Sequence, residues 1–557
     1  MIKTKIISSL SRVFIDNTLD DFEALTRISA LKGETVSFQL VHHRIMEPHE
    51  NMYAYREIIE PRFSGKLAKY VNVREVKNVG VELPVIVGNT DENFERTTPG
   101  LYPDVLKPLH YEGKTVSKTA FPTSLWVELV LPEDMTEIGE SELLIEMYTE
   151  GGEKLSEDAI TVDVINATLP KQELILTQWF HCDSLAHYYD VEVWSEKHWQ
   201  IVENFARCAH DNGINLLLTP TFTPPLDTKP GGERLTNQLV GVTVTDGKYS
   251  FNFDLVDRWV DMCDRIGIER FEIAHFFTQW GACHAPKVMA TVDGEYKKIF
   301  GWETEATAPE YVSFLRQFVT EFLAHMKKNG NDKRCFFHIS DEPQIQHLES
   351  YTKAKATVSD LLEGYVIMDA LSDYDFWEKG IVDLPIPCND HIKPFIENSV
   401  PNLWTYYCCG QCIGVSNRLI AMPSWRNRSI GMQMYKYDIV GFLQWGFNFY
   451  NNWYSVDQIE PFTDPSGEHW VPAGDPFSVY PGPKGMPLES LRIVVFHEAL
   501  QDMRAMKLCQ TLYSKQEVVD AIESVLGENL AFDVCAKSES TMLKIREKIN
   551  EMIKAKI

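Results

Sequence analysis

Two rhythms of hydrophobic and polar residues divide the chain. Up to about residue 167, short runs rich in β-branched and aromatic residues alternate apolar with polar positions, which is typical of half-buried strands. The clearest runs are residues 35–42, 79–87, 125–132, 142–148 and 159–165. Because turn residues separate these runs and few helical patterns intervene, the first part predicts a β-sandwich domain over residues 1–167.

After Leu169-Pro170 the pattern changes to strands that alternate with helices. The expected strands are residues 174–180, 215–219, 270–276, 334–339, 365–369, 381–386, 402–407 and 441–445. The expected helices include residues 196–211, 255–266, 309–328, 345–362, 426–439 and 488–506. Eight such alternations place the chain in the α/β class and predict a (β/α)8 TIM-like barrel over residues 168–510.

The main alternative to a barrel is a doubly wound sheet. That fold carries a glycine-rich phosphate-binding turn after its first strand, and no such turn follows any expected strand. The tail, residues 511–557, has a charged helical pattern and predicts a short C-terminal extension.

Composition narrows the range of partners. The chain of 557 residues is 44% hydrophobic and 24% charged, which is ordinary for a globular protein, and its formal net charge is −27. Such a surface repels phosphate backbones and anionic lipids, so we expect neither nucleic acid nor a membrane surface as partner. The oligomeric state is not predicted.

The sequence also bears on location. The first residues lack a small-residue cleavage site, and no run of eighteen apolar residues occurs, so we expect neither a signal peptide nor a membrane-spanning helix. The chain has 11 cysteines, an odd number, which favours reduced thiols. Together these observations predict a cytoplasmic protein.

Polar and aromatic side chains gather where the expected barrel strands end, which is where barrels of this class build their active sites. The candidates for substrate binding are His181, Asp183, His275, Gln279, Asn389, Trp404, Tyr406, Trp445 and Asn448. Aromatic rings stack on the C–H faces of sugars, and acids, amides and histidines bind sugar hydroxyls. The set therefore predicts a carbohydrate ligand, the alternative being an ordinary polar barrel mouth.

The segment FFHISDEP, residues 336–343, places two carboxylates directly after an apolar strand. Neighbours in a strand point to opposite faces, so Asp341 and Glu342 can serve one ligand only if the strand breaks there. Pro343 favours such a break, because it disfavours α geometry at the residue before it. Burial and the neighbouring charge would raise the pKa of Glu342 and keep it protonated as an acid. The alternative is a helix N-cap.

Two further groups allow other interpretations. His181, Asp183 and His187 could bind a metal, although their spacing matches no standard zinc motif. Cys409 and Cys412 form a C-x-x-C that could be a redox or zinc site, but no second such pair exists, which favours reduced thiols. We therefore expect neither a metal nor a cofactor.

Five segments in this order resemble glycoside hydrolase family 123, the β-N-acetylgalactosaminidases, over most of residues 170–510. They are WFHCDSLA, FHISDEP, LWTYYCC, YDIVGFLQWGFN and AGDPFSVYPG. The resemblance implies an N-terminal β-sandwich followed by a (β/α)8 barrel. It also implies a retaining, substrate-assisted hydrolysis of β-linked 2-acetamido sugars, an exception to the scheme with two enzyme carboxyls.

By that resemblance, Glu342 is the acid and base, and Asp341 orients the 2-acetamido group. Insert-like stretches at residues 223–238 and 277–306 leave the sugar specificity open. The alternatives are a glycosidase for a different sugar, exo or endo, and a carbohydrate-binding barrel without activity.

Overall fold

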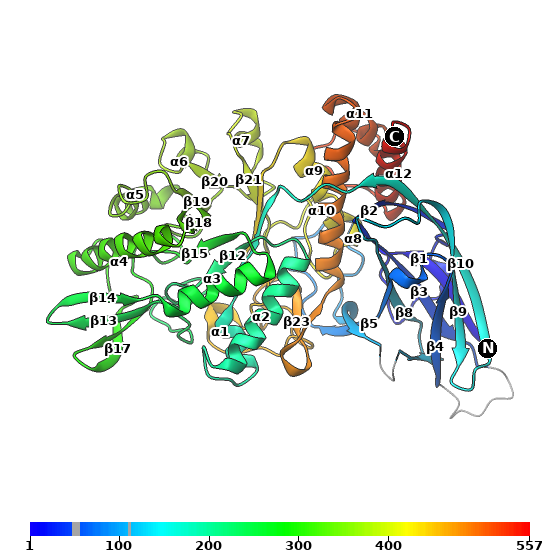
Figure 1. The fold of residues 1–557 in the computed structure, drawn as a ribbon, viewed down its shortest axis with the longest axis horizontal. Coiled ribbons are helices and arrows are strands. Elements are labelled where there is room, and N and C mark those ends of the chain that lie inside the picture. The colour runs from blue at the N-terminus through cyan, green and yellow to red at the C-terminus, as the bar shows by residue number, and fades with distance from the viewer. Residues whose placement is uncertain (47–55, 110–112) are drawn as a thin grey trace. The chain divides into compact units, whose positions relative to one another are not determined.

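The computed structural model describes residues 1–46, 56–109 and 113–557 of a mixed α/β protein (Figure 1). These residues form two compact units. The first contains Met1–Gln172, Cys412–Tyr437 and Leu488–Ile557, and the second contains Glu173–Gln411 and Asp438–Pro487. Every helix in the described ranges is too short or too polar to span a bilayer.

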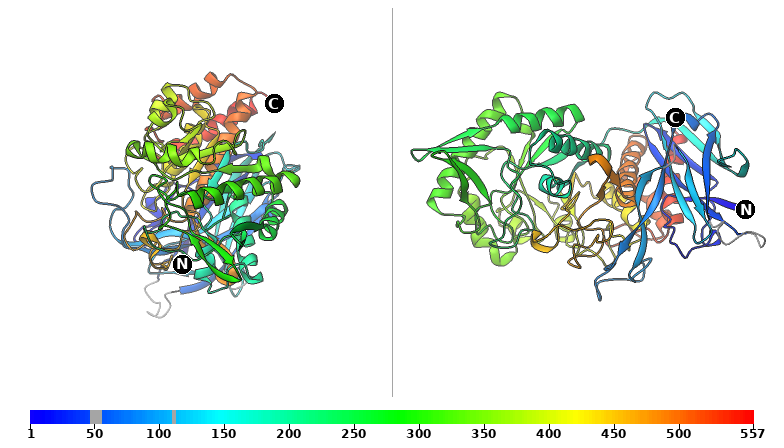
Figure 2. Two further views of the ribbon diagram at one scale, coloured as in Figure 1. Left: turned by 90° about the vertical axis from the view of Figure 1, so that its left-hand side faces the viewer. Right: turned by 90° about the horizontal axis from the view of Figure 1, so that it is seen from below.

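Two five-stranded sheets form most of the first unit (Figures 1 and 2). One sheet has the order β1 (Ile2–Ser8), β3 (Thr35–Arg44), β8 (Thr123–Val130), β5 (Val71–Val81), β6 (Gly100–Pro108). The other has the order β2 (Arg27–Lys32), β10 (Lys154–Thr168), β9 (Gly139–Thr149), β4 (Arg56–Ser64), β7 (Thr115–Lys118). The sheets share one hydrophobic core, in which Phe38 and Leu125 of the first join Ile145 and Val162 of the second.

One expected strand of this unit is mostly wrong. The run 79–87 has β-branched residues at alternate positions, but β5 ends at Val81 and the remainder is turn and coil. Pro84 follows three residues later and cannot donate a ladder hydrogen bond. Without a partner strand, Val87 is left 96% exposed.

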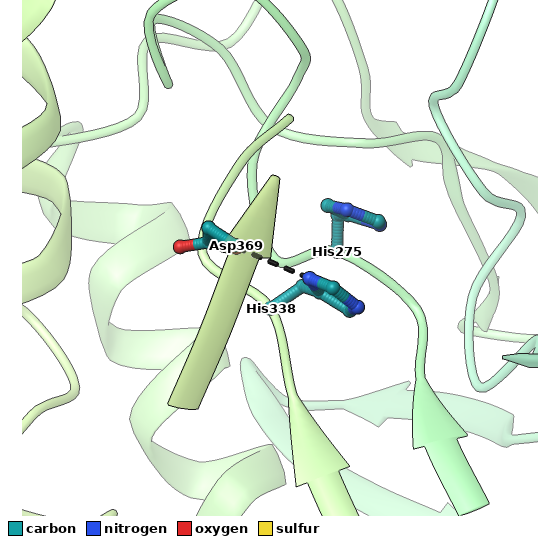
Figure 3. A group of neighbouring side chains, drawn as sticks. All are labelled: His275, His338 and Asp369. Atoms are coloured by element: carbon teal, nitrogen blue, oxygen red, sulfur yellow. Dashed lines mark hydrogen bonds and ion pairs between the residues drawn. The ribbon is translucent and has the colours of Figure 1, made fainter. Parts of the chain in front are cut away.

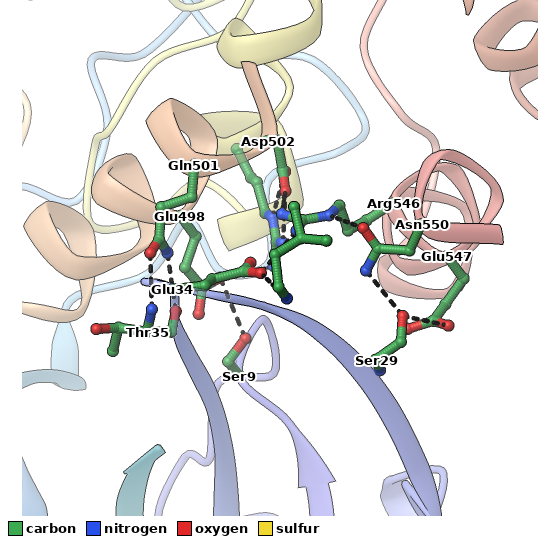
Figure 4. A network of polar contacts seen from close by, with 12 residues as sticks. Ser9, Ser29, Glu34, Thr35, Glu498, Gln501, Asp502, Arg546, Glu547 and Asn550 are labelled. Atoms are coloured by element: carbon green, nitrogen blue, oxygen red, sulfur yellow. Dashed lines mark hydrogen bonds and ion pairs between the residues drawn. The ribbon is translucent and has the colours of Figure 1, made fainter. Parts of the chain in front are cut away.

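The helices of the first unit are α8 (Ser424–Arg428), α9 (Ile430–Lys436), α10 (Leu491–Gln510), α11 (Lys515–Leu526) and α12 (Glu539–Lys554). The single helix expected over 426–439 is thus two short ones. Arg428 of α8 and Arg546 of α12 meet the carboxylates of Glu34, Glu498 and Asp502 in a buried network (Figure 4).

The second unit contains eight short parallel strands, each inside an expected range or one residue beyond it. They are β11 (Ile175–Gln178), β12 (Leu216–Thr219), β15 (Arg270–Ile273), β18 (Cys335–Phe337), β19 (Val366–Ala370), β20 (Leu384–Ile386), β21 (Trp404–Tyr406) and β22 (Gly441–Gln444). Hydrogen bonds join them as β12-β15-β18-β19-β20 and as β11-β22-β21. In addition, β11 contacts β12 and β20 contacts β21.

The helices between these strands include α2 (Glu196–Asp211), α3 (Asp254–Ile266), α4 (Pro309–Lys328) and α5 (Leu348–Ala356). The first three agree with the expected ranges to within one residue. Each presents an apolar stripe inward, as the helical period of the sequence predicts. The fourth is shorter than expected, because turns replace the helix after Ala356.

A small sheet of the second unit was not predicted. It has the order β14 (Lys248–Asn252), β13 (Gly241–Thr245), β16 (Val288–Val292), β17 (Glu295–Phe300). Its two hairpins turn at Asp246-Gly247 and Asp293-Gly294, where all four residues have positive φ. An Asp-Gly pair between alternating residues is the usual sequence mark of such a two-residue turn, so the hairpins could have been predicted.

Candidate active site

A cavity of about 690 Å³, including its open mouth, lies in the second unit where several of the parallel strands end. Trp179 follows β11, Ala370 ends β19 and Tyr406 ends β21. The other lining residues are Asp227, Trp280, Asp341, Glu342, Cys408, Cys409, Leu443, Trp445, Trp470 and Val471. Its size and its mixture of aromatic and acidic residues suit a small polar ligand with apolar faces.

The two adjacent carboxylates both line this cavity. The strand β18 ends at Phe337, and Glu342 has a φ of 42°, a left-handed conformation that is strained for a residue with a side chain. Two backbone hydrogen bonds hold the bend: Glu342 N–H donates to Ala370 O (3.0 Å), and Trp280 N–H donates to Asp341 O (2.9 Å). The expected break in the strand is therefore present.

The helix-cap interpretation of this segment is wrong. The chain continues from Pro343 into a short 3-10 turn, Ile345–His347, and α5 begins only at Leu348. Asp341 and Glu342 therefore lie before the first turn of α5, and capping of this helix does not explain their position.

The electrostatic environment disfavours ionisation of both carboxyls. Burial raises the pKa of Asp341 well above its usual range, and the charges of Glu342 and Asp227 add to this effect. Burial also raises the pKa of Glu342, while the hydrogen bond that Tyr406 Oη donates to Glu342 Oε1 (2.5 Å) opposes it. Two coupled acids in this position can keep a proton at neutral pH.

A third carboxyl, Asp227, also lines the cavity and was not among the predicted residues. It lies in the insert-like stretch 223–238 at a φ of 47°, and its N–H donates to Gln279 Oε1 (2.6 Å). No described residue donates a hydrogen bond to its carboxylate, and burial raises its pKa to about 7. Its distance in sequence from Asp341 left no local pattern that could have identified it.

Tryptophans form much of the cavity wall. The indole N–H of Trp179 donates to Glu272 Oε1 and that of Trp445 to Asp475 Oδ2, both at 2.8 Å. These bonds orient the two rings. Trp470 packs on Trp445 with a centroid distance of 5.5 Å. Rings positioned in this way provide rigid apolar surfaces for a ligand.

Beneath the wall, a buried network supports the segment that precedes the acid pair (Figure 3). His338 contacts Asp369 Oδ1 through Nδ1 (3.2 Å) and Glu272 Oε1 through Nε2 (2.7 Å). Burial lowers the pKa of His338, but these two carboxylates outweigh it and raise the pKa to about 9. Asp369 also accepts the backbone N–H groups of Ile339 (3.0 Å) and Ser340 (3.3 Å), so the network fixes the chain leading to Asp341.

His275, His338 and Asp369 come close enough together to be considered as metal ligands. However, both ring nitrogens of His338 already bond carboxylates. The two imidazoles are stacked at 4.1 Å and 15°, so their in-plane lone pairs do not converge on one point. The arrangement fits a packed polar network better than a metal site.

Of the nine predicted binding residues, Tyr406 and Trp445 line the cavity. Trp404 does not: it is buried against Phe336, and a Cβ on Gly441 would lie 2.0 Å from its ring. Asn389 is buried beside β21, where its N–H donates to Tyr406 O (2.8 Å).

His181, Asp183 and Asn448 form a buried cluster with Arg234 instead of lining the cavity. Arg234 binds both carboxylate oxygens of Asp183 at 2.8 Å and contacts His181 Nδ1 at 3.1 Å. Asn448 bonds both the N–H (2.8 Å) and the C=O (3.1 Å) of His181. The guanidinium occupies the place that the metal interpretation gave to a cation, and His187 is exposed. Arg234 had no local sequence mark.

The residues of the C-x-x-C, Cys409 and Cys412, are not joined by a disulfide. All 11 cysteines lie in the described ranges, and none of them forms a disulfide. Cys408 and Cys409 line the cavity, and a hydrogen bond with Cys409 together with burial raises the pKa of Cys408 well above its usual range. Cys412 packs against Leu419 and Met422. A thiol kept protonated is a poor nucleophile and metal ligand.

Comparison with known proteins agrees with this geometry. Residues 179–509 match the glycoside hydrolase 123 catalytic domain. A structure from Clostridium perfringens, a family 123 glycoside hydrolase studied for glycolipid glycan hydrolysis, superposes with a TM-score of 0.74 at 15% identity, covering 100% of this chain and 98% of that one. No curated protein matches the sequence.

Two other solved structures are much less similar. A β-glucuronidase from Parabacteroides merdae has a TM-score of 0.28 at 9% identity, covering 80% of this chain and 46% of that one. A family 2 glycosyl hydrolase from Bacteroides cellulosilyticus has a TM-score of 0.26 at 10% identity, covering 79% and 46%. The family match extends over more than half of the chain and includes the acid pair and its cavity. The chain belongs to glycoside hydrolase family 123, and it is a glycoside hydrolase with a carbohydrate substrate.

Proposed function

We propose that the enzyme cleaves terminal β-linked 2-acetamido-2-deoxy sugars of the N-acetylgalactosamine type, with retention and substrate assistance. The observation that carries the proposal is the pair Asp341-Glu342 at a broken strand end, both facing one cavity. Two adjacent carboxyls on one side of a sugar can address neighbouring substituents of that sugar. A nucleophile on the opposite face would require a carboxyl from another strand, about 5 Å away.

The architecture is proposed to be a (β/α)8 barrel over residues 168–510 after a β-sandwich over residues 1–167. The hydrogen-bonded order of the eight strands, together with the β11–β12 and β20–β21 contacts, supports closure. A closed barrel brings the C-terminal ends of all strands to one mouth, where side chains distant in sequence can serve one ligand.

In the proposed mechanism, protonated Glu342 gives its proton to the glycosidic oxygen as the bond to the anomeric carbon breaks. The acetamido oxygen of the same sugar attacks that carbon and forms an oxazolinium ion. Asp341 accepts the acetamido N–H and stabilises the developing positive charge. Glu342, now a carboxylate, then takes a proton from a water molecule as that water attacks the anomeric carbon. The attack opens the oxazolinium ring and gives the product with net retention of configuration.

The raised pKa values support this division of roles. In the free enzyme both carboxyls resist ionisation. Ionisation of Asp341 is the more costly, because the like charges of Glu342 and Asp227 lie close to it. A bound acetamido N–H would stabilise the Asp341 carboxylate, because hydrogen bonds to the charged form lower a pKa. Substrate binding would thus leave the proton on Glu342, where the leaving oxygen needs it.

Asp227 is proposed to bind a hydroxyl group of the same sugar. Its carboxylate faces the cavity without a described hydrogen-bond donor, whereas Trp179 and Trp445 provide faces for the ring. An acceptor without a partner in the free enzyme is suited to a ligand that brings donors. We extend the substrate class to the glycans of glycolipids on the basis of the Clostridium perfringens relative.

The decisive experiment compares aryl 2-acetamido-2-deoxy-β-galactoside, the corresponding β-glucoside and a plain β-galactoside. We expect turnover to require the acetamido group and the galactoside to be preferred. Equal turnover of the plain galactoside would refute substrate assistance. Tight sugar binding without turnover of any glycoside would instead indicate that this member has kept only the binding function.

A further inference from the structure

An aromatic rim continues outward from the cavity wall. It consists of Trp280, Tyr454 and Trp453. The rings of Trp280 and Tyr454 meet edge to face with centroids 6.1 Å apart, and Tyr454 stacks on Trp453 at 4.4 Å. Trp280 lines the cavity and is 37% exposed, while Trp453 lies outside it and is 52% exposed. Exposed aromatic groups that continue from a cavity mark a ligand-binding surface rather than core packing.

The backbone holds this rim in a strained conformation. Trp280 and Tyr454 have φ values of 58° and 61°, which cost free energy for residues with side chains. Hydrogen bonds to the backbone oxygens of two cavity residues hold this part of the chain in place. Trp280 N–H donates to Asp341 O (2.9 Å), and Ser455 Oγ donates to Asp227 O (2.9 Å).

A further bond joins the rim to the insert-like stretch 223–238, because Lys229 N–H donates to Tyr454 O (3.0 Å). The residues that carry cavity carboxyls therefore also position the rim. Strain retained by such anchors is a feature of functional sites.

We propose that the aromatic rim binds the first sugar ring of the leaving group, the residue to which the cleaved 2-acetamido sugar is attached. The inference rests on the proposed function, since it assumes that the terminal sugar fills the cavity. With that sugar inside, the rest of the glycan must leave through the mouth. A ring leaving there meets Trp280 first and then Tyr454 and Trp453.

The surroundings of the rim favour a neutral sugar over other occupants. Indole and phenol rings offer flat faces with polar edges, which match the C–H faces and hydroxyls of a pyranose. The formal net charge of −27 disfavours a carboxylated sugar.

The test compares a neutral trisaccharide ending in β-linked N-acetylgalactosamine with the corresponding β-glycosyl fluoride, whose leaving group is too small to reach the rim. For Trp453→Ala we expect the ratio of kcat/KM for the trisaccharide to that for the fluoride to fall about tenfold, as the loss of one stacked aromatic surface implies. Trp453→Phe, which keeps a flat ring, should restore most of the ratio.

A matched control is Tyr296→Ala, because Tyr296 is 62% exposed on β17 and does not line the cavity. Its ratio should remain that of the unmodified enzyme. A ratio that changes less than twofold in Trp453→Ala would overturn the inference. So would a loss confined to substrates with an attached acyl chain, which would assign the rim to lipid.

Binding measurements separate this inference from the proposed function. Calorimetry with the trisaccharide and the slow variant Glu342→Gln, with and without Trp453→Ala, does not depend on turnover. We expect about tenfold weaker binding when the rim ring is removed. If the fluoride is not hydrolysed at all, the proposed function fails. Unchanged trisaccharide affinity would contradict the rim alone.

Discussion

Buried carboxylates behave in opposite ways in the two units. In the first unit, Asp502 accepts three hydrogen bonds from Arg428 and Arg546 at 2.7–3.0 Å (Figure 4). Burial alone would raise the pKa of Asp502, but the two guanidinium groups lower it below its usual range. In the second unit, Asp341 and Glu342 line a cavity together with aromatic rings, and their pKa values are raised.

The difference shows that burial does not decide the state of a carboxyl by itself. A carboxylate with two cations has its desolvation compensated and stays charged. Glu498 is intermediate: burial outweighs the attraction of Arg428, and its pKa rises to about 7. Among the described residues, no cation hydrogen-bonds to the cavity pair, so the pair keeps the capacity to hold and release a proton. The carboxylate bound by guanidinium groups stabilises the fold, whereas the acids without a described cationic partner are available for proton transfer.

We expect the largest effect on activity from a change to the cavity acids, which have no described cationic partner. Glu342→Gln keeps the shape of the side chain but removes the proton donor, and we expect kcat on an oligosaccharide to fall about 10³-fold. Steady-state rates would measure it. Glu349→Gln on the exposed surface of α5 is the matched control and should leave kcat unchanged. A Glu342→Gln enzyme with more than a tenth of the activity would rule out the acid role.

Removing a paired carboxylate should instead destabilise the protein. Asp502→Ala leaves two buried guanidinium groups without their shared partner, and we expect the free energy of unfolding to fall by about 3–5 kcal/mol. Urea denaturation would measure the change. Asp520→Ala, at an exposed position of α11, is the control. A loss no larger than that of the control would mean that the network contributes little to stability.

Asp341→Asn combines both kinds of effect. We expect activity on acetamido substrates to fall about 10²-fold, because the N–H of the substrate loses a charged acceptor. A raised pKa in the folded state means that stability from this group is present at low pH and is lost as pH rises through that pKa. Asparagine cannot ionise, so the variant should melt about 1–3 °C higher than the unmodified enzyme at pH 8.

At pH 3.5, where Asp341 is protonated, the two melting temperatures should coincide. Thermal unfolding followed by calorimetry at both pH values provides the check. A variant that melts lower at pH 8 would show that Asp341 is stabilised as a carboxylate, which would contradict the electrostatic comparison.

The smallest effect concerns Tyr406. Its hydrogen bond lowers the pKa of Glu342, so Tyr406→Phe should raise that pKa. Because the acid must be protonated to work, the alkaline limb of the kcat profile should move upward by about 0.5–1 pH unit. Tyr296→Phe on the exposed hairpin is the control. A downward shift of the limb would assign it to another group.

Much of the second unit was predictable because its elements are local patterns. The eight strands and the helices α2, α3 and α4 lie where the period of apolar residues placed them. The break at Pro343 and the exposure of both carboxyls to one cavity also followed from neighbouring residues. The candidate binding residues were less predictable, because a position at a strand end does not tell whether a side chain meets the ligand or a buried partner.

Arg234 shows the reason. It lies 51 residues after Asp183, yet it binds both oxygens of that carboxylate and takes His181 into the same cluster. Asp227 reached the cavity in the same way, from an insert without a recognisable pattern. Such pairings depend on how loops of different strands meet, and no spacing within the sequence encodes them.

The sequence by itself determined the alternation of strands and helices, the pair Asp341-Glu342 and the family to which they belong, because these depend on local periodicity and on contiguous residues. Only the tertiary structure decided which polar groups are neutralised by a partner and which remain for a substrate. That distinction depends on desolvation and on charges that approach through space, and the chain brings these together only when it folds.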